Sequence, residues 1–297
     1  MSFINIIYHR ARCLASGLFL RTETSAPLIE CVWRPFEWYG IARWRIRSEI
    51  RVVQRRSSSI LYEWKGYCVW WPTDADVERL ITMFVELFVP SNPHYFTPPA
   101  ALPWREKAVV IDVGSCEGLF ALRAAREFGA GHVIAIEPGP VMAKLLGETF
   151  AANMLSSKMD VVQCLVGAKL GHARFKECIS DPTRASINFA DDGPGDLMEI
   201  RTLDNLATVM ALSRVDVIKV DAEGADYDIL KGAEGIIRRW RPMLLITTYH
   251  CPDHAKKMRR WIEGLGLGYN IMFRGITTMN TKQVRPVLLL ACIQHLA

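Results

Sequence analysis

Two acidic residues directly follow an apolar segment in the C-terminal half of the chain. The segment VDVIKV is followed by Asp221 and Glu223, and Gly224 comes next. Because carboxylates lose much hydration free energy beside a buried strand, we interpret their place as a requirement of chemistry. Asp, Glu and His are the side chains that most often take a proton from a reacting hydroxyl group. His250 ends the next apolar segment, so the predicted catalytic residues are Asp221, Glu223 and His250.

Other roles for these three residues stay open on the sequence. The acids can cap the helix that follows, because negative charge is favourable in a first helical turn. His250 can be an ordinary loop histidine. The three side chains can also hold a divalent metal ion, since oxygen and imidazole are ligands of such ions. No dedicated metal-ligand spacing is present, so we predict no metal site, and we expect Lys219 to pair with Asp221.

Apolar strand-like runs alternate with amphipathic helical patterns from residue 108 onward. The predicted strands cover residues 108–114, 132–138, 160–167, 215–221, 242–250, 268–275 and 286–294. Such alternation predicts an α/β fold with an open, doubly wound, mostly parallel sheet that helices cover on both faces. The last two strands have no helix between them, which indicates an antiparallel hairpin at one edge of the sheet.

The region before residue 108 has a different character. Residues 60–72 alternate like a strand or hairpin and 75–88 carry a helical apolar stripe, whereas 89–103 contain five prolines. We therefore predict a basic N-terminal segment, a strand–helix extension with a proline-rich linker, and a main domain. Their boundaries are 1–56, 57–107 and 108–297.

A glycine-containing turn and an acid stand at the ends of the first two predicted strands of the main domain. The turn is DVGSCEG, residues 112–118, and Glu137 follows Asp112 by 25 residues. An acid at this place can accept both hydroxyl groups of a ribose. The turn lacks the G-x-G-x-x-G spacing that seats a diphosphate, and Glu117 would repel one at the helix start. The pattern therefore favours a nucleoside cofactor without phosphates, S-adenosylmethionine, over NAD or FAD.

The motifs DVGSCEG, IEPGP, RTLDNL, IKVDAEGADYDILKGAE and LLITTYH together resemble the FkbM-like family of class I, S-adenosylmethionine-dependent methyltransferases. The resemblance covers about residues 108–273. It implies a seven-stranded, Rossmann-like methyltransferase sheet and O-methylation. By the motif match, Glu137 would hold the ribose, and the amino-acid end of the cofactor would lie against Asp112, Gly114, Ser115 and Gly118.

The leading hypothesis is an S-adenosylmethionine-dependent O-methyltransferase that acts on a hydroxyl of a small molecule, glycan or lipid. A non-catalytic methyltransferase-like binding domain is the alternative, and a nicotinamide-dependent oxidoreductase is a weaker one. The polar loop 180–196 is either a substrate lid, with Arg184 and Ser186 nearest the cofactor, or a surface loop. We expect no nucleic-acid partner.

Charge and cysteine usage suggest where the protein works. The net charge is +5, and residues 1–56 alone contain ten Arg and four Glu. With Trp33, Trp38 and Trp44 among the arginines, this segment is predicted either to be a solvated surface or to contact an anionic membrane peripherally. The eight cysteines are scattered, with no C-x-x-C pair, and we find neither a membrane-spanning run nor a convincing signal peptide. We therefore expect a cytoplasmic protein.

Overall fold

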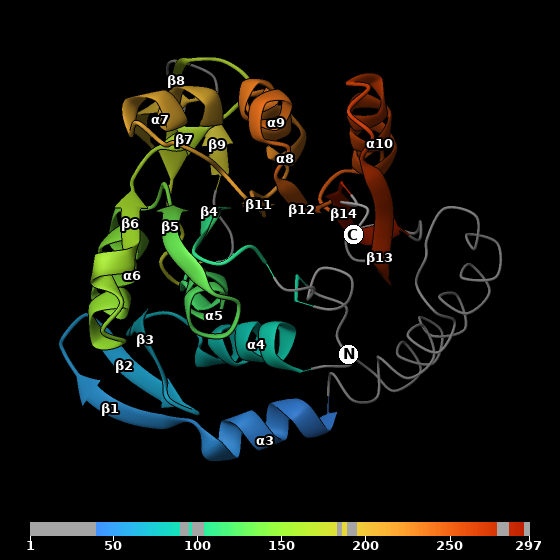
Figure 1. The fold of residues 1–297 in the computed structure, drawn as a ribbon. Helices are drawn as coiled ribbons and strands as arrows, with labels where there is room; N and C mark the ends of the chain where they lie inside the picture. Colours follow the sequence, from blue (N-terminus) through green and yellow to red (C-terminus); the bar gives the residue numbers. More distant parts are fainter. Residues whose placement is uncertain are drawn as a thin grey trace.

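A seven-stranded sheet forms the centre of the protein (Figure 1). The computed structural model describes residues 40–89, 95–96, 104–182, 186–188, 195–277 and 285–293. The strand order is β13-β14-β12-β11-β4-β5-β6. The bounds are β4 Ala108–Val113, β5 Ala130–Ile136, β6 Met159–Val162, β11 Val217–Val220, β12 Met243–Thr247, β13 Asn270–Thr277 and β14 Arg285–Cys292. The predicted α/β fold is confirmed.

Most of the sheet is parallel, and one edge is antiparallel. β12, β11, β4, β5 and β6 pair in parallel, whereas β14 is antiparallel to both β12 and β13. The predicted hairpin at the edge is therefore confirmed. The chain runs outward from β4 to β5 and β6, and only later places β11 on the other side of β4. β4 and β11 thus flank the point where strand order reverses, the usual place for a ligand in such sheets.

Helices cover both faces of the sheet. α4 (Val77–Phe88), α5 (Leu119–Glu127) and α6 (Pro140–Ala152) bury one face, together with sheet residues such as Val110. The other face, which includes Ile111, is covered by α7 Leu203–Val209, α8 Asp226–Lys231, α9 Glu234–Trp240 and α10 His254–Gly264. Because successive strand residues point to opposite faces, strands with apolar residues at every position require both layers.

A small antiparallel sheet of three strands packs against α6 of the main domain. It follows α3 (Ala42–Glu49) and has the order β1-β2-β3, with bounds β1 Arg51–Arg55, β2 Ser59–Trp64 and β3 Tyr67–Pro72. The backbone amide of Trp70 donates to Thr149 Oγ1 of α6 at 3.0 Å. The predicted boundary at residues 56 and 57 falls in the turn between β1 and β2, so these strands join the two predicted segments in one sheet.

Two predicted elements were wrong in detail. The third predicted strand, 160–167, is divided into β6 and β7 (Leu165–Val166), and β7 pairs in parallel with β10 (Asp196–Arg201) in a second sheet. That sheet has the order β7-β10-β8-β9, with β8 Gly171–Lys176 and β9 Ser186–Asn188. The sequence pattern after the fourth predicted strand, with apolar residues at 229, 230, 233, 237 and 240, predicts one helix, but the chain forms two helices there, α8 and α9.

Several predictions concern residues outside the described ranges. They include most of the basic segment 1–56, most of the proline-rich linker and Arg184. Ser186 begins β9. None of the helices in the described ranges is both long and apolar enough to cross a membrane.

Candidate active site

The loop after β11 carries the two acids singled out by their position. The strand ends at Val220, and the amide of Asp221 donates to the carbonyl of Val113 at 3.1 Å, which ties the loop to β4. Glu223 and Gly224 both have left-handed backbone conformations, with φ of 48° and 109°. This conformation is uncommon for a residue such as Glu223 and turns the chain sharply between strand and helix. The side chains of both acids keep contact with solvent.

Asp226, the first residue of α8, holds this loop in place. Its carboxylate is fully buried and accepts hydrogen bonds from the amides of Ala222 at 2.8 Å and Gly224 at 3.1 Å. It also accepts one from Thr247 Oγ1 at 2.9 Å. Burial raises the pKa of Asp226. The hydrogen bond and charge of His250, together with hydrogen bonds from Ala222 and Thr247, have a larger effect, so the pKa is lowered overall.

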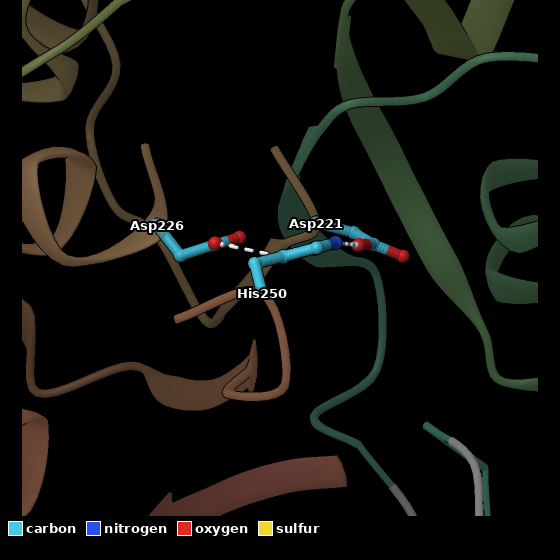
Figure 2. Close-up of side chains that lie close together, drawn as sticks. All are labelled: Asp221, Asp226 and His250. Carbon is cyan, nitrogen blue, oxygen red and sulfur yellow. Dashed lines mark hydrogen bonds and ion pairs between the residues drawn. The ribbon is translucent and has the colours of Figure 1, made fainter. Parts of the chain in front are cut away.

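His250 lies between the carboxylates, as Figure 2 shows for Asp226 and Asp221. Its Nδ1 is 2.9 Å from Asp226 Oδ2, and its Nε2 is 3.6 Å from Asp221 Oδ1 and 3.5 Å from Glu223 Oε1. Burial lowers the pKa of His250, but the hydrogen bond with Asp226 and the nearby carboxylates of Glu223 and Asp221 raise it to about 11. The structure therefore brings the three predicted catalytic residues together around the imidazole of His250.

Two residues of this cluster were missed on the sequence. Asp226 was overlooked, although its place three residues after Glu223, at a helix start, could have singled it out. Tyr95 comes from the proline-rich linker, and its hydroxyl donates to Asp221 Oδ2 at 2.8 Å. No local sequence pattern predicts this contact, because 126 residues separate the two partners along the chain.

The expected partner of Lys219 was wrong. Its Nζ lies 3.0 Å from Asp112 Oδ1, and it also donates to the carbonyl of Gly114 at 2.7 Å. Lys219 and Asp112 are direct partners in the pairing of β11 with β4, whereas Asp221 lies two residues further along the same strand direction. Neighbouring strands are closer than alternate residues of one strand, so the cross-strand partner is favoured. Burial lowers the pKa of Lys219, and the charges of Asp112 and Asp221 raise it by more.

The two glycines of the turn after β4 are required by close packing. Both have left-handed φ, +71° at Gly114 and +84° at Gly118. A Cβ at Gly114 would lie 1.8 Å from the carbonyl oxygen of Asp221, and one at Gly118 would lie 2.5 Å from Leu146 Cδ1. Ser115 is buried, and its hydroxyl donates to the carbonyl of Asp112 at 2.8 Å. Gly114 therefore allows the turn of residues 112–118 to touch the loop that carries Asp221.

Glu137 stands next to this turn, just after the end of β5. Its Oε2 accepts from the amide of Cys116 and its Oε1 from the amide of Gly139, both at 3.0 Å. Burial raises the pKa of Glu137 to about 7, although the two amide hydrogen bonds oppose the shift. A carboxylate offers about four acceptor positions, so about two remain for further donors. These acceptor positions fit the two hydroxyl groups of a ribose, which would donate to them.

Comparison with known proteins identifies the family. The sequence model of a protein family, the methyltransferase FkbM domain, matches residues 112–271, more than half of the 297 residues. The chain belongs to the FkbM methyltransferase family. The FkbM domain contains all eight predicted site residues, from Asp112 to His250.

Relatives of this FkbM domain are distant in sequence. Methyltransferase sdnD of Sordaria araneosa is 23% identical over 172 residues, which cover 45% of this chain and 66% of the relative. Methyltransferase 1 of Beauveria bassiana is 24% identical over 156 residues, 44% of this chain and 61% of the relative. This chain thus spans less than two thirds of either protein.

Solved structures that are similar to the chain also have low sequence identity to it. The methyltransferase FkbM of Methylobacillus flagellatus KT is 19% identical, with a TM-score of 0.49, over 72% of this chain and 53% of that one. An O-methyltransferase from Bacillus cereus in complex with SAH is 13% identical, with a TM-score of 0.38, over 63% of this chain and 74% of that one.

Proposed function

We propose that the protein is an S-adenosylmethionine-dependent O-methyltransferase that acts on a hydroxyl group of a small molecule, glycan or lipid. The observation that carries the proposal is the position of Glu137. Its carboxylate is hydrogen-bonded to Cys116 of the glycine turn and keeps acceptor capacity for a ribose. The turn in turn touches the loop of Asp221 through Gly114. Cofactor and acceptor sites would therefore be neighbours.

In this proposal Glu137 holds the ribose, while Asp112, Gly114, Ser115 and Gly118 shape the place of the amino-acid end. When bound, S-adenosylmethionine would supply a methyl group on a sulfonium for displacement by the acceptor oxygen, with the hydroxyl proton passing to a carboxylate of the chain. Such a displacement requires alignment and a nucleophile free of its proton.

The acidic loop would supply these two requirements. Asp221 and Glu223 keep contact with solvent, so they can reach an acceptor hydroxyl and take its proton. His250 Nε2 faces both carboxylates, 3.6 Å from Asp221 Oδ1 and 3.5 Å from Glu223 Oε1, and helps to orient them. Asp226 acts through His250 as a positioning residue.

Calorimetric titration with S-adenosylhomocysteine tests the cofactor part of the proposal. We expect the unmodified chain to bind, and Glu137→Ala to weaken binding by about 10–100-fold, because hydrogen bonds to a charged group are lost. Glu137→Gln retains one carbonyl acceptor and should lose less. Glu148→Ala, a matched change on the partly exposed side of α6, should bind as the unmodified chain does. Absence of binding, or equal affinity for all variants, overturns the proposal.

Transfer of a radioactive methyl group to a broad set of hydroxyl compounds tests the catalytic part. Labelling that is lost in Asp221→Asn supports the enzyme. Cofactor binding without labelling of any acceptor supports the alternative, a non-catalytic methyltransferase-like domain.

Cytoplasmic location and peripheral membrane contact through residues 1–56 stay predictions. The six cysteines of the described ranges are free thiols. Trp44 is exposed, yet Arg43, Arg47 and Arg51 of the same region form ion pairs with Glu78 or Glu63. Flotation with anionic liposomes, comparing the full chain with one that starts at residue 57, measures the contact; equal behaviour removes the prediction.

A further inference from the structure

The side chains around His250 have the composition and spacing of a metal site. Asp221, Asp226 and His250 each offer a ligand atom, and these atoms lie within 4.8 Å of one another. They converge from the ends of β11 and β12 and the start of α8, with the imidazole between the two carboxylates (Figure 2). No other group of this kind is found among the residues that the structure describes.

The second ring nitrogen of His250 gives an independent indication of a ligand. The side chain is 7% exposed, and its Nε2 is buried without a hydrogen-bond partner. It points at Asp221 Oδ1, 3.6 Å away, and at Glu223 Oε1, 3.5 Å away. These distances are long for hydrogen bonds. Two ligands that each lie about 2.0–2.2 Å from one ion are themselves about 3–3.5 Å apart, so an ion needs only a small adjustment here.

The first ring nitrogen is held in the manner of a metal-binding histidine. Its Nδ1 lies 2.9 Å from Asp226, whose carboxylate is fixed by the amides of Ala222 and Gly224. Histidines that bind metals usually donate their other ring N–H to a carboxylate, which fixes the tautomer and orients the ring. Asp226 therefore directs Nε2 toward Asp221 and Glu223.

The local charge also favours a cation. Three carboxylates, those of Asp221, Glu223 and Asp226, surround one imidazole. Lys219, the nearby cation buried in the sheet, is engaged by Asp112 at 3.0 Å. Metal binding at Nε2 requires a neutral imidazole, so the three carboxylates leave the cluster with a negative charge that a divalent ion would reduce.

We infer that Asp221 and His250 Nε2 bind a divalent metal ion, with Asp226 as the carboxylate that supports the histidine and Glu223, 3.5 Å from Nε2, as the nearest further acid. Oxygen and imidazole ligands together suit first-row ions such as Mn²⁺ or Zn²⁺. The inference deepens the proposed function and rests on it for its purpose: an ion here would stabilise negative charge on the acceptor oxygen. The alternative left open on the sequence thus replaces the expectation of no metal.

Direct metal binding to the full chain tests the inference without an acceptor. After treatment with EDTA and dialysis, Mn²⁺ binding is followed by electron paramagnetic resonance and Zn²⁺ binding by calorimetry. We expect one ion per chain, with affinity lowered at least about 10-fold in Asp221→Asn and His250→Gln and about 10–100-fold in Asp226→Asn. Asp228→Asn, a change of an exposed acid on α8, should bind the ion normally.

Two measurements separate failure of the metal site from failure of the proposed function. Thermal unfolding establishes that each variant is folded, and titration of the metal-free chain with S-adenosylhomocysteine reports the cofactor site alone. Cofactor binding without Mn²⁺ or Zn²⁺ binding, or ion binding that is unchanged in Asp221→Asn and His250→Gln, overturns the metal site and leaves the methyltransferase proposal standing. Ion binding without cofactor binding overturns the proposed function instead.

Discussion

Charged side chains are buried at the tips of β4, β11 and β12, whereas those of the small N-terminal sheet and its neighbouring helices lie at the surface. At the strand tips, Asp112, Lys219 and Asp226 are buried; Lys219 forms an ion pair with Asp112, and Asp226 accepts hydrogen bonds from loop amides. In the N-terminal region the charged pairs, such as Arg43 with Glu78, lie at the surface. The interior of that region is aromatic and aliphatic instead, and its buried residues include Trp64, Trp70, Trp71, Leu80 and Phe84.

This difference shows where the molecule retains charges at a cost in stability. Burying a charged group is unfavourable unless partners compensate for the lost hydration, and apolar packing would serve the fold as well or better. The buried residues of the N-terminal region are mostly apolar, and its core is continuous with that of α5 and α6. The buried charges at the strand tips therefore indicate chemistry, in line with the site proposed there.

Removing a buried charge should have the largest effect on stability. Asp226→Asn is expected to lower the free energy of unfolding by about 2–4 kcal/mol, because His250 and two loop amides lose a charged acceptor. Urea denaturation measures the change. Asp228→Asn, two residues further along α8 and exposed, serves as the control and should stay within about 0.5 kcal/mol. Equal effects of the two changes would contradict the contrast between the regions.

Glu117 should give an intermediate effect that depends on pH. Burial raises the pKa of its carboxyl to about 7 from 4.5. Between these values the folded chain holds a proton that the unfolded chain releases, so the free energy of unfolding falls as pH rises from about 4.5 to about 7. Glu117→Gln should remove up to about 3 kcal/mol of this decrease. Urea denaturation at several pH values measures the slope, and an unchanged slope would show that Glu117 is not desolvated.

Glu78 in the N-terminal region should show the smallest effect, with the opposite sign. Burial raises the pKa of Glu78, but its pairs with Arg47 and Arg43 lower it overall, so these pairs stabilise the fold above the unfolded pKa and lose their effect as pH falls. Glu78→Gln should lower the free energy of unfolding by less than about 1 kcal/mol near neutral pH. At acid pH the variant and the unmodified chain should unfold alike. A loss as large as that of Asp226→Asn would refute the comparison.

Secondary structure was predictable wherever a short stretch carries its own pattern. The strand at 108–114 and the helix at 75–88 correspond to β4 and α4, because burial on a sheet or on one helix face imposes a local period. The run 160–167 failed for the converse reason. Its apolar residues are buried or partly buried, but in two different sheets, and periodicity does not specify the partner of a strand.

By itself the sequence determined which residue types follow each strand. Asp221, Glu223, His250 and Glu137 were named because parallel strands bring their carboxyl ends to one edge. Only the tertiary structure decided the partners: Lys219 with Asp112, and His250 with Asp226. The physical reason is distance. Which charges pair depends on separations of a few ångströms between strands remote in sequence, and these are set by register and packing, which no local pattern encodes.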